Sequence, residues 1–133
     1  SPDINFCKGS RLIRPADRKK IPIIRLYGNI ILTILTKFNC KNIKLTDAVN
    51  GFLAIKSSLL KKINLNKVSS NFFFEEDFLF HLSFHNISLK EVPIKTIYHK
   101  NDNSNLSPFK TIFPFIISHL KNFIIRIYVK KIK

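Results

Sequence analysis

Short runs of strand character alternate along this chain with longer segments in which apolar residues recur at helical spacing. The expected helices cover 22–38, 57–62, 72–85 and 108–131, and the expected strands cover 4–7, 52–55 and 89–98. The first strand is expected to end in a turn at Gly9, with a basic loop after it over 11–20. Strands that alternate with helices predict an α/β layer, in which ligands gather at the loops beyond the strand ends.

The length of 133 residues allows one domain with one sizeable core, or a piece of a domain. Hydrophobic residues make up 45% of the chain, including 13 Phe, so the chain can bury enough apolar surface to fold. The chain contains no methionine, which indicates truncation. Its first residues have neither the basic start nor the apolar run of a signal peptide. Cys7 and Cys40 are expected to be buried thiols, because two separated cysteines make neither a disulfide framework nor a four-ligand metal site.

Positive charge dominates the composition. Lys and Arg number 23 against 8 acidic residues, which gives a net charge of +15, and no acidic residue follows Asp102. Such an excess predicts a polyanionic partner, which can be nucleic acid, anionic lipid headgroups or a phosphorylated substrate.

A basic tetrapeptide, Lys-Gly-Ser-Arg, follows the first expected strand. Lys8 and Arg11 flank Gly9, so backbone N–H groups and a forked guanidinium can meet phosphate oxygens there. The alternative is a solvated basic turn, which is the commoner situation for such a sequence.

A second polar motif lies just before the expected strand at 52–55. Asp47 and Asn50 precede Gly51, and Asp47 could take a proton from an attacking oxygen or orient a sugar hydroxyl. The structural alternative is a cap or an Asn-Gly turn, which these residue types also favour.

Three of the eight acids stand together in an aromatic run, at Glu75, Glu76 and Asp77. Like charges this close raise one another's proton affinity, which suits acid–base chemistry or cation binding where the side chains converge. The alternative is the first turn of a helix, where the macrodipole favours acids. His81 and His85 lie four residues apart, but no third metal ligand at a suitable spacing accompanies them, so ordinary helix histidines are expected.

The final segment predicts an amphipathic basic helix. Its apolar side comprises Ile116, Ile117, Leu120, Phe123, Ile124, Ile127 and Tyr128, and its polar side comprises Ser118, Asn122, Arg126 and Lys133. Lys121 and Arg126 would each cost about 2.5–3.5 kcal/mol at a bilayer centre, so the helix is expected to lie on a membrane rather than span it. Packing into the core of a larger domain is the alternative.

Taken together and in order, these segments resemble the C-terminal half of the dolichol-phosphate-mannose-synthase-like family 2 glycosyltransferases. The matching segments are Lys-Gly-Ser-Arg at 8–11, Pro-x-x-Arg-x-x-Gly-Asn at 22–29, Asp-Ala-Val-Asn-Gly-Phe at 47–52, Phe-Glu-Glu-Asp-Phe-Leu at 74–79, Glu-Val-Pro-Ile at 91–94, and the loop from Tyr98 to Leu106. Each match is loose, and their order along the chain makes the set specific.

The resemblance implies the C-terminal half of a GT-A-type fold, with part of the catalytic domain at 1–107 and a membrane-proximal helix at 108–133. It implies inverting transfer of a sugar from a nucleotide sugar to a polyprenyl phosphate, by an enzyme held at the cytoplasmic face of a membrane with an anionic surface. By this resemblance the catalytic residues would be Asp47, Glu75 and Asp77, and the phosphate- and substrate-binding residues would be Lys8, Arg11, Arg25, Asn50, Lys100 and Ser104.

The sequence also departs from the family pattern. No Asp-x-Asp metal motif occurs in it, and the nucleotide-binding half that carries this motif in the family would precede Ser1. The chain alone is therefore expected to be inactive and to hold no metal or other cofactor, whereas the full-length enzyme would use Mg²⁺ or Mn²⁺. In the loop, Asp102 and Asn105 stand where the family usually has Glu and a basic residue, so Lys100 is the candidate for the phosphate contact.

Two functions of other classes remain as alternatives. One is a basic module that binds nucleic acid, and the other is a protein that only binds a membrane surface. Nucleic acid is the less expected partner, because the basic residues are not interleaved with a recognised binding platform and many phenylalanines stand at core-like spacing.

Overall fold

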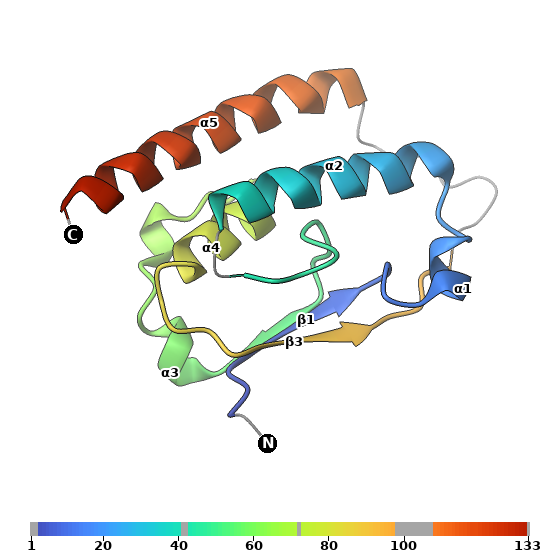
Figure 1. Ribbon diagram of the computed structural model, residues 1–133, viewed down its shortest axis with the longest axis horizontal. Coiled ribbons are helices and arrows are strands. Elements are labelled where there is room, and N and C mark those ends of the chain that lie inside the picture. The colour runs from blue at the N-terminus through green and yellow to red at the C-terminus, as the bar shows by residue number, and fades with distance from the viewer. Residues whose placement is uncertain (1–2, 41–42, 72, 98–107, 133) are drawn as a thin grey trace.

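The computed structural model describes residues 3–40, 43–71, 73–97 and 108–132 (Figure 1). In chain order the elements are β1 (Phe6–Ser10), α1 (Pro15–Arg18), α2 (Ile23–Asn39), β2 (Leu53–Ile55), α3 (Ser57–Leu60), the 3₁₀ turn η1 (Leu65–Lys67), α4 (Phe74–Leu82), β3 (Leu89–Pro93) and α5 (Pro108–Ile132). Strands and helices alternate, so the prediction of an α/β architecture is confirmed.

The three strands form one mixed sheet in the order β2-β1-β3. β1 pairs antiparallel with β2, so that Cys7 lies opposite Ala54, and parallel with β3, so that Cys7 lies opposite Lys90. Because β1 and β3 run in the same direction, Ser10 and Pro93 end their strands at one edge of the sheet. The segments that follow both strands therefore emerge together there.

The core forms where α4, α3 and the segment that follows α2 meet the sheet. Its buried members are Phe6, Cys40, Ile43, Leu45, Ala48, Leu59, Ile63, Phe78, Leu79, Phe80 and Leu82. α4 supplies four of these residues, because its apolar side chains occur all round this part of the helix and not along one stripe. Cys40 is buried as expected, and Cys7 is half-buried, so the prediction of two buried thiols holds only for Cys40.

Gly9 does not form the predicted turn. β1 continues through it to Ser10, Gly9 pairs with Val92, and its N–H donates to the carbonyl of Phe52 at 2.8 Å. A Cβ at this position would lie 3.1 Å from Phe52 Cβ and 3.1 Å from Ile94 Cγ2. The glycine therefore allows neighbouring segments of the backbone to approach β1 closely. Sequence rules for turns do not predict such a close approach.

Three other local predictions are wrong in part. The expected loop at 11–20 contains α1, β3 ends at Pro93 and not at residue 98, and β2 is not buried. β2 is an edge strand, and Phe52 before it is 72% exposed. At the end of β3, Pro93 has no N–H to donate, and the last bond of this pairing runs from the N–H of Ile94 to Ser10.

α2 and α5 were predicted within one or two residues, but both turn their polar sides inward. The buried residues of α2 are Thr33, Thr36 and Asn39, and the buried polar residues of α5 are His119 and Asn122. The side chains that face outward, here called the α2–α5 apolar face, are Ile23, Ile24, Tyr27, Ile31, Ile34, Leu35 and Phe38 of α2 with Phe113, Ile116, Ile117, Leu120, Phe123, Ile124, Ile127 and Tyr128 of α5.

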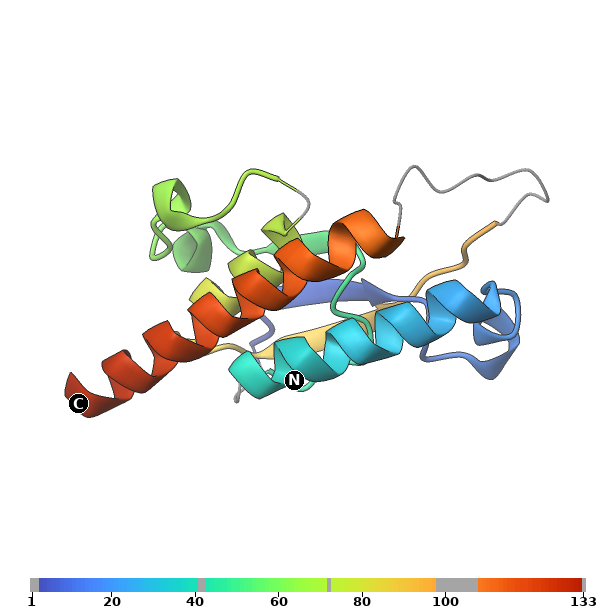
Figure 2. The ribbon, with the colours of Figure 1, turned by 90° about the horizontal axis from the view of Figure 1, so that it is seen from above.

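No helix in the described part of the chain is both long and apolar enough to cross a membrane. α5 packs against α2 and α4 and lies with α2 on one side of the sheet (Figures 1 and 2). The apolar side of α5 therefore does not enter the core of this domain.

Candidate functional site

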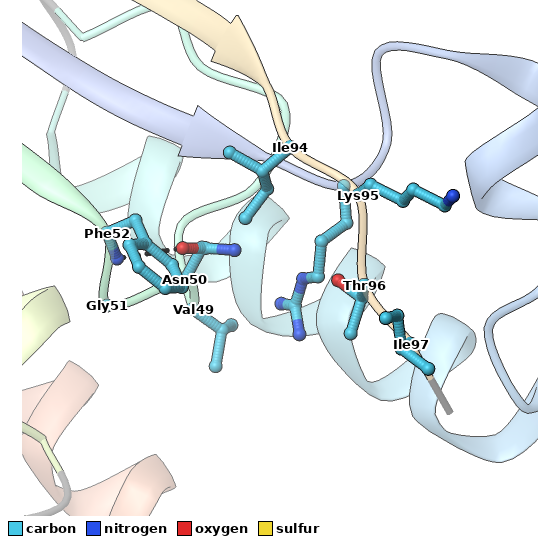
Figure 3. Close-up of a pocket in the computed structure, with 9 residues that line it drawn as sticks. Val49, Asn50, Gly51, Phe52, Ile94, Lys95, Thr96 and Ile97 are labelled. Carbon is cyan, nitrogen blue, oxygen red and sulfur yellow. Dashed lines mark hydrogen bonds between the residues drawn. The ribbon is translucent and has the colours of Figure 1, made fainter. Parts of the chain in front are cut away.

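An open hollow of about 620 Å³ lies at the edge of the sheet where β1 and β3 end (Figure 3). It is lined by Arg11, Val49, Asn50, Gly51, Phe52, Ile94, Lys95, Thr96 and Ile97. The lining thus comes from the segment after β1, the 46–52 loop and the segment after β3. In Figure 3, Ile94 points toward Asn50 and Phe52, whereas Lys95 extends away from them.

Arg11 and Asp47 form a forked ion pair beside this hollow. Arg11 donates from Nε to Asp47 Oδ2 at 2.7 Å and from Nη2 to Oδ1 at 2.8 Å, and its backbone N–H reaches Oδ2 at 3.1 Å. The Asp47 side chain is fully buried, whereas 18% of the Arg11 side chain is exposed. Two matched hydrogen bonds fix the plane of the guanidinium, so the cation is oriented before any ligand arrives.

The 46–52 loop is held by side chains from three elements. Glu91 of β3 accepts from the Thr46 N–H at 2.7 Å, and Ser10 of β1 shares a hydrogen bond with the Thr46 hydroxyl at 2.7 Å. Thr33 of α2 accepts from the Ala48 N–H at 3.0 Å. These contacts satisfy backbone groups of a partly buried loop and set the position of Asp47.

Lys8 lies beneath the same loop. Its side chain is 1% exposed, and its ammonium donates to the carbonyl oxygen of Asn50. Burial lowers the pKa of Lys8, and the nearby charges of Asp47 and Glu75 act in the opposite direction. Asn50 in turn accepts from the Phe52 N–H through Oδ1 at 2.8 Å, so its side chain shapes the turn that lines the hollow.

Two carboxylates of α4 approach this region. Glu75 Oε1 lies 3.2 Å from the position that a Cβ on Gly51 would occupy, so Glu75 contacts the loop closely. Glu76 is 4% exposed, and neither of its carboxylate oxygens has a hydrogen-bond partner in the described part of the molecule. The pKa of Glu76 is raised to about 7, chiefly by burial, with the Glu75 charge acting in the same direction and the Lys8 charge opposing it.

Glu76 was not among the predicted site residues. The position of three acids in an aromatic run indicated that one of them would gain proton affinity, and this occurs at Glu76. Helical periodicity does not distinguish Glu76 from its neighbours, because buried residues occur all round α4 and Asp77 is as buried as Glu76.

Asp77 lies elsewhere and joins other elements. Its Oδ2 accepts from the Ser69 N–H at 2.8 Å, and its Oδ1 accepts from Asn122 Nδ2 at 3.2 Å. Asp77 thus ties the segment before α4 and the helix α5 to the core, and it is 4% exposed.

The remaining predicted residues lie apart from the hollow or outside the described residues. Arg25 is half-buried in the first turn of α2 and is not part of the lining. Lys100 and Ser104 both fall within 98–107, outside the residues that the structure describes. The structure therefore brings Lys8, Arg11, Asp47, Asn50 and Glu75 together and leaves Asp77 and Arg25 outside this group.

The described side chains do not fit a divalent cation. Across residues 3–40, 43–71, 73–97 and 108–132, no three His, Cys, Asp or Glu residues converge as a metal site would require. Asp77, the third acid of the cluster on α4, is engaged by Ser69 and Asn122.

Comparison with known proteins shows distant similarity to an archaeal enzyme. The UDP-N-acetylglucosamine–dolichyl-phosphate N-acetylglucosaminyltransferase of Methanococcus voltae is 30% identical over 93 residues, which are 70% of this chain and 37% of that protein. An uncharacterized protein of Methanocaldococcus jannaschii is 29% identical over 116 residues, which are 84% of this chain and 47% of that protein.

The chain therefore spans less than half the length of these curated relatives. No protein-family model matches it, and no solved structure matches it. The comparisons thus establish a distant relationship to a glycosyltransferase.

Proposed function

We propose that this chain is the C-terminal part of a family 2 glycosyltransferase of GT-A type, which transfers a sugar from a nucleotide sugar to a polyprenyl phosphate with inversion. The similarity to the Methanococcus voltae enzyme supports both the reaction class and the lipid phosphate acceptor. Because the chain spans 37% of that enzyme, the proposed activity belongs to a longer protein that contains this chain.

One observation carries the proposal. Side chains that are far apart in the sequence meet at one edge of the sheet, where Arg11 is paired with Asp47 beside an open hollow. Arg11 and Asp47 are 36 residues apart, and Lys8 and Asn50 are 42 residues apart. Ligands of α/β proteins bind beyond the carboxyl ends of parallel strands, which is where this group lies.

Arg11 is the proposed phosphate-binding residue. Its guanidinium lines the hollow, and Asp47 holds it in a fixed plane. A phosphate that enters the hollow would meet a planar, permanently charged group without a large loss of side-chain entropy.

Asp47 acts in this proposal as a positioning residue, whereas the sequence offered it as a base or as a carboxylate that orients a sugar hydroxyl. Three N–H groups of Arg11 already donate to its oxygens, and its side chain is fully buried. The acceptor also needs little help from a base, because a phosphate monoester has a second pKa of about 6 and is largely deprotonated at neutral pH. Its oxygen can therefore attack without first losing a proton.

Glu75 is the carboxylate we assign to the sugar. It is half-buried and lies against Gly51, a residue of the hollow, so it can accept a hydrogen bond from a sugar hydroxyl beside the phosphate. Asp77 is a structural residue in this proposal, since its oxygens bind Ser69 and Asn122. The divalent cation expected for the longer enzyme would need ligands beyond the described residues of this chain.

The test is a transfer assay on the full reading frame that contains this chain. Membranes with the protein are incubated with labelled UDP-N-acetylglucosamine and dolichyl phosphate, and label in the organic extract is measured. Arg11→Lys keeps the charge but loses the fork, so we expect turnover to fall roughly 10- to 100-fold. Lys56→Gln, which removes an exposed ion pair with Asp3, is the control and should keep full turnover.

Two results would contradict the proposal, one its reaction class and the other its site. One is the absence of lipid-linked label with every nucleotide sugar and polyprenyl phosphate tested, for a protein shown to be folded. The other is normal turnover in folded Arg11→Lys protein, which would remove the assignment of this site while leaving the reaction class.

A further inference from the structure

Glu91 does not line the hollow, yet it is hydrogen-bonded to the loop that carries Asp47. It lies near the end of β3, shortly before Ile94, which lines the hollow. Its Oε1 accepts from the backbone N–H of Thr46 at 2.7 Å and from the Thr46 hydroxyl at 3.0 Å, and the N–H of Asp47 donates to it at 3.4 Å. Donors from two consecutive loop residues therefore meet at one oxygen of β3.

The carboxylate fixes the direction of the hydrogen bonds beside it. An ionised carboxylate only accepts, so the Thr46 hydroxyl donates its one proton to Glu91. Ser10 Oγ lies 2.7 Å from Thr46 Oγ1 and must donate to it, which leaves Ser10 Oγ to accept from the Leu12 N–H at 3.1 Å. One chain of hydrogen bonds thus runs from the end of β1 through the 46–52 loop to β3.

This chain of hydrogen bonds encloses the forked ion pair. Arg11 lies between Ser10 and Leu12, and Asp47 follows Thr46, so each residue of the ion pair is next to a member of the chain. The two Asp47 oxygens set the plane of the guanidinium, and the loop sets the position of Asp47. A shift of Thr46 would therefore be transmitted to Arg11.

We propose that Glu91 is a positioning residue for phosphate binding, which holds Thr46 and Asp47 so that the Arg11 guanidinium keeps the orientation that a phosphate meets in the hollow. The assignment rests on the proposed function, since it concerns the same hollow. Glu91 does not touch the ligand in this proposal, and it lies 44 residues from Asp47 in the sequence.

Charge and positioning give opposite effects of Glu91 on phosphate binding. A carboxylate near a phosphate site repels the anion, so a role through charge alone predicts that its removal strengthens binding. A positioning role predicts that its removal weakens binding, because Arg11 is then less firmly held and the ligand has to order it. The sign of the change in affinity therefore separates the two roles.

Two substitutions of Glu91 separate its hydrogen bonds from its charge. Glu91→Gln removes the charge but keeps a carbonyl oxygen that can accept from Thr46, whereas Glu91→Ala removes the acceptor as well. Lys90→Ala, at the exposed neighbouring position of β3, is the matched control on the same strand. Asn39→Ala removes buried contacts with His119 and is the control for a general loss of stability.

Hydrogen exchange of the Arg11 Nε–H measures the positioning directly, by NMR of the nitrogen-labelled chain. This group donates to a fully buried carboxylate, so its exchange with water should be slow, and loss of its signal in Arg11→Lys assigns it. We expect Glu91→Ala to speed this exchange roughly tenfold, and Glu91→Gln, Lys90→Ala and Asn39→Ala to change it less than about twofold. Unchanged exchange in folded Glu91→Ala would overturn the proposal.

The transfer assay on the longer protein gives a functional measurement. KM is determined separately for the polyprenyl phosphate and for the nucleotide sugar, because the phosphate that meets Arg11 can belong to either. We expect Glu91→Ala to raise one of the two KM values roughly tenfold with kcat changed less than about threefold, and Glu91→Gln to keep both KM values within about twofold. The substrate whose KM rises is the one whose phosphate Arg11 binds.

Thr46→Val tests the same chain of hydrogen bonds if Glu91→Ala does not fold. Thr46 is exposed, and valine keeps its shape and its backbone N–H but has no hydroxyl to link Ser10 with Glu91. We expect the exchange of the Arg11 Nε–H to become roughly threefold faster and the same KM to rise roughly threefold. No change in either quantity would overturn the proposal.

The results that reject Glu91 differ from those that reject the transfer reaction. A KM that falls or stays constant in Glu91→Ala, an equal rise of both KM values, or an equal effect of Asn39→Ala would each reject the positioning role. If the longer protein transfers no sugar, the proposed function fails, and the exchange of the Arg11 Nε–H still decides whether Glu91 positions that side chain.

Discussion

Asp47 and Arg11 illustrate how one residue pair can serve both stability and a binding site. The carboxylate is fully buried, while its partner remains 18% exposed at the hollow. A buried charge is tolerated because three N–H groups donate to it, and removal of one partner leaves the other uncompensated. The same geometry that satisfies the carboxylate also orients the guanidinium.

Asp47→Asn should therefore destabilise the fold by about 3 kcal/mol, because the variant loses the charge that compensates Arg11 and one side of the matched fork. Urea unfolding followed by circular dichroism measures the change. Lys56→Gln breaks an ion pair with Asp3 in which both side chains are exposed, and it should change stability by less than about 0.5 kcal/mol. Equal effects of the two substitutions would contradict this account.

Glu76 predicts a specific dependence of stability on pH. Folding raises the pKa of Glu76 from 4.5 to about 7, so between these values the native state holds a proton that the unfolded chain has lost. The contribution of Glu76 to the free energy of unfolding therefore falls as the pH rises from 4.5 to about 7. Above about pH 7 the destabilisation by this group is complete.

Glu76→Gln removes this titration. The variant should match the parent in stability at pH 4 and exceed it at pH 8 by on the order of 3 kcal/mol. Urea midpoints across this pH range give the difference curve, in which the contributions of the other titratable groups largely cancel. A flat difference curve would show that Glu76 titrates normally in the folded protein.

At the scale of single elements, two glycines have opposite roles. A Cβ on Gly9 in β1 would meet Phe52 and Ile94 at 3.1 Å, whereas a Cβ on Gly28 in α2 would meet no atom within 4 Å. Gly9→Ala should cost about 1–3 kcal/mol through crowding, and Gly28→Ala should stabilise by about 0.5–1 kcal/mol through helix propensity. Thermal unfolding of both variants checks the opposite signs, and a loss of stability in Gly28→Ala would mean that α2 is not a regular helix there.

Polar contacts contribute to the attachment of α5 to the domain. Asn39 is 3% exposed and holds His119 through two contacts, while burial lowers the pKa of His119. Asn39→Ala should cost about 1–3 kcal/mol and speed amide hydrogen exchange in α5, because buried polar groups lose their partner. Lys37→Ala, at an exposed site of the same helix, should leave exchange in α5 unchanged. Unaltered exchange in Asn39→Ala would show that other contacts hold α5.

For the whole molecule, two features oppose each other in water. A net charge of +15 keeps copies apart, while the α2–α5 apolar face favours association. Added salt screens the charges but not the apolar surface, so light scattering from the purified chain should rise as NaCl is increased from about 0.01 M to about 1 M, as the Debye length falls from about 30 Å to about 3 Å. A mild detergent should reverse the rise. Scattering that stays constant at high salt would show that the face is covered in solution.

Except for α1 and η1, the existence and order of the elements followed from the sequence because they depend on local patterns. Apolar residues at helical spacing located α2 and α5 within two residues, and the helix predicted at 72–85 located α4 within three residues at each end. The loop residues Asp47 and Asn50 could be selected for the same reason. Polar residues beside an Asn-Gly pair indicate a turn from the local sequence alone, without knowledge of their tertiary contacts. Charge and motif order indicated a phosphate chemistry, to which the similarity with a glycosyltransferase lends support.

The tertiary structure alone decided which side of each element faces inward and which groups meet. A helical wheel separates the polar side of a helix from its apolar side but does not say which side faces the domain. The polar sides of α2 and α5 face inward because Asn39, Asn122 and Arg126 form hydrogen bonds with neighbouring elements. The pairing of Arg11 with Asp47 and the engagement of Asp77 with Asn122 depend on contacts between distant parts of the chain. Such contacts leave no periodic trace in the sequence, so only the folded arrangement reveals them.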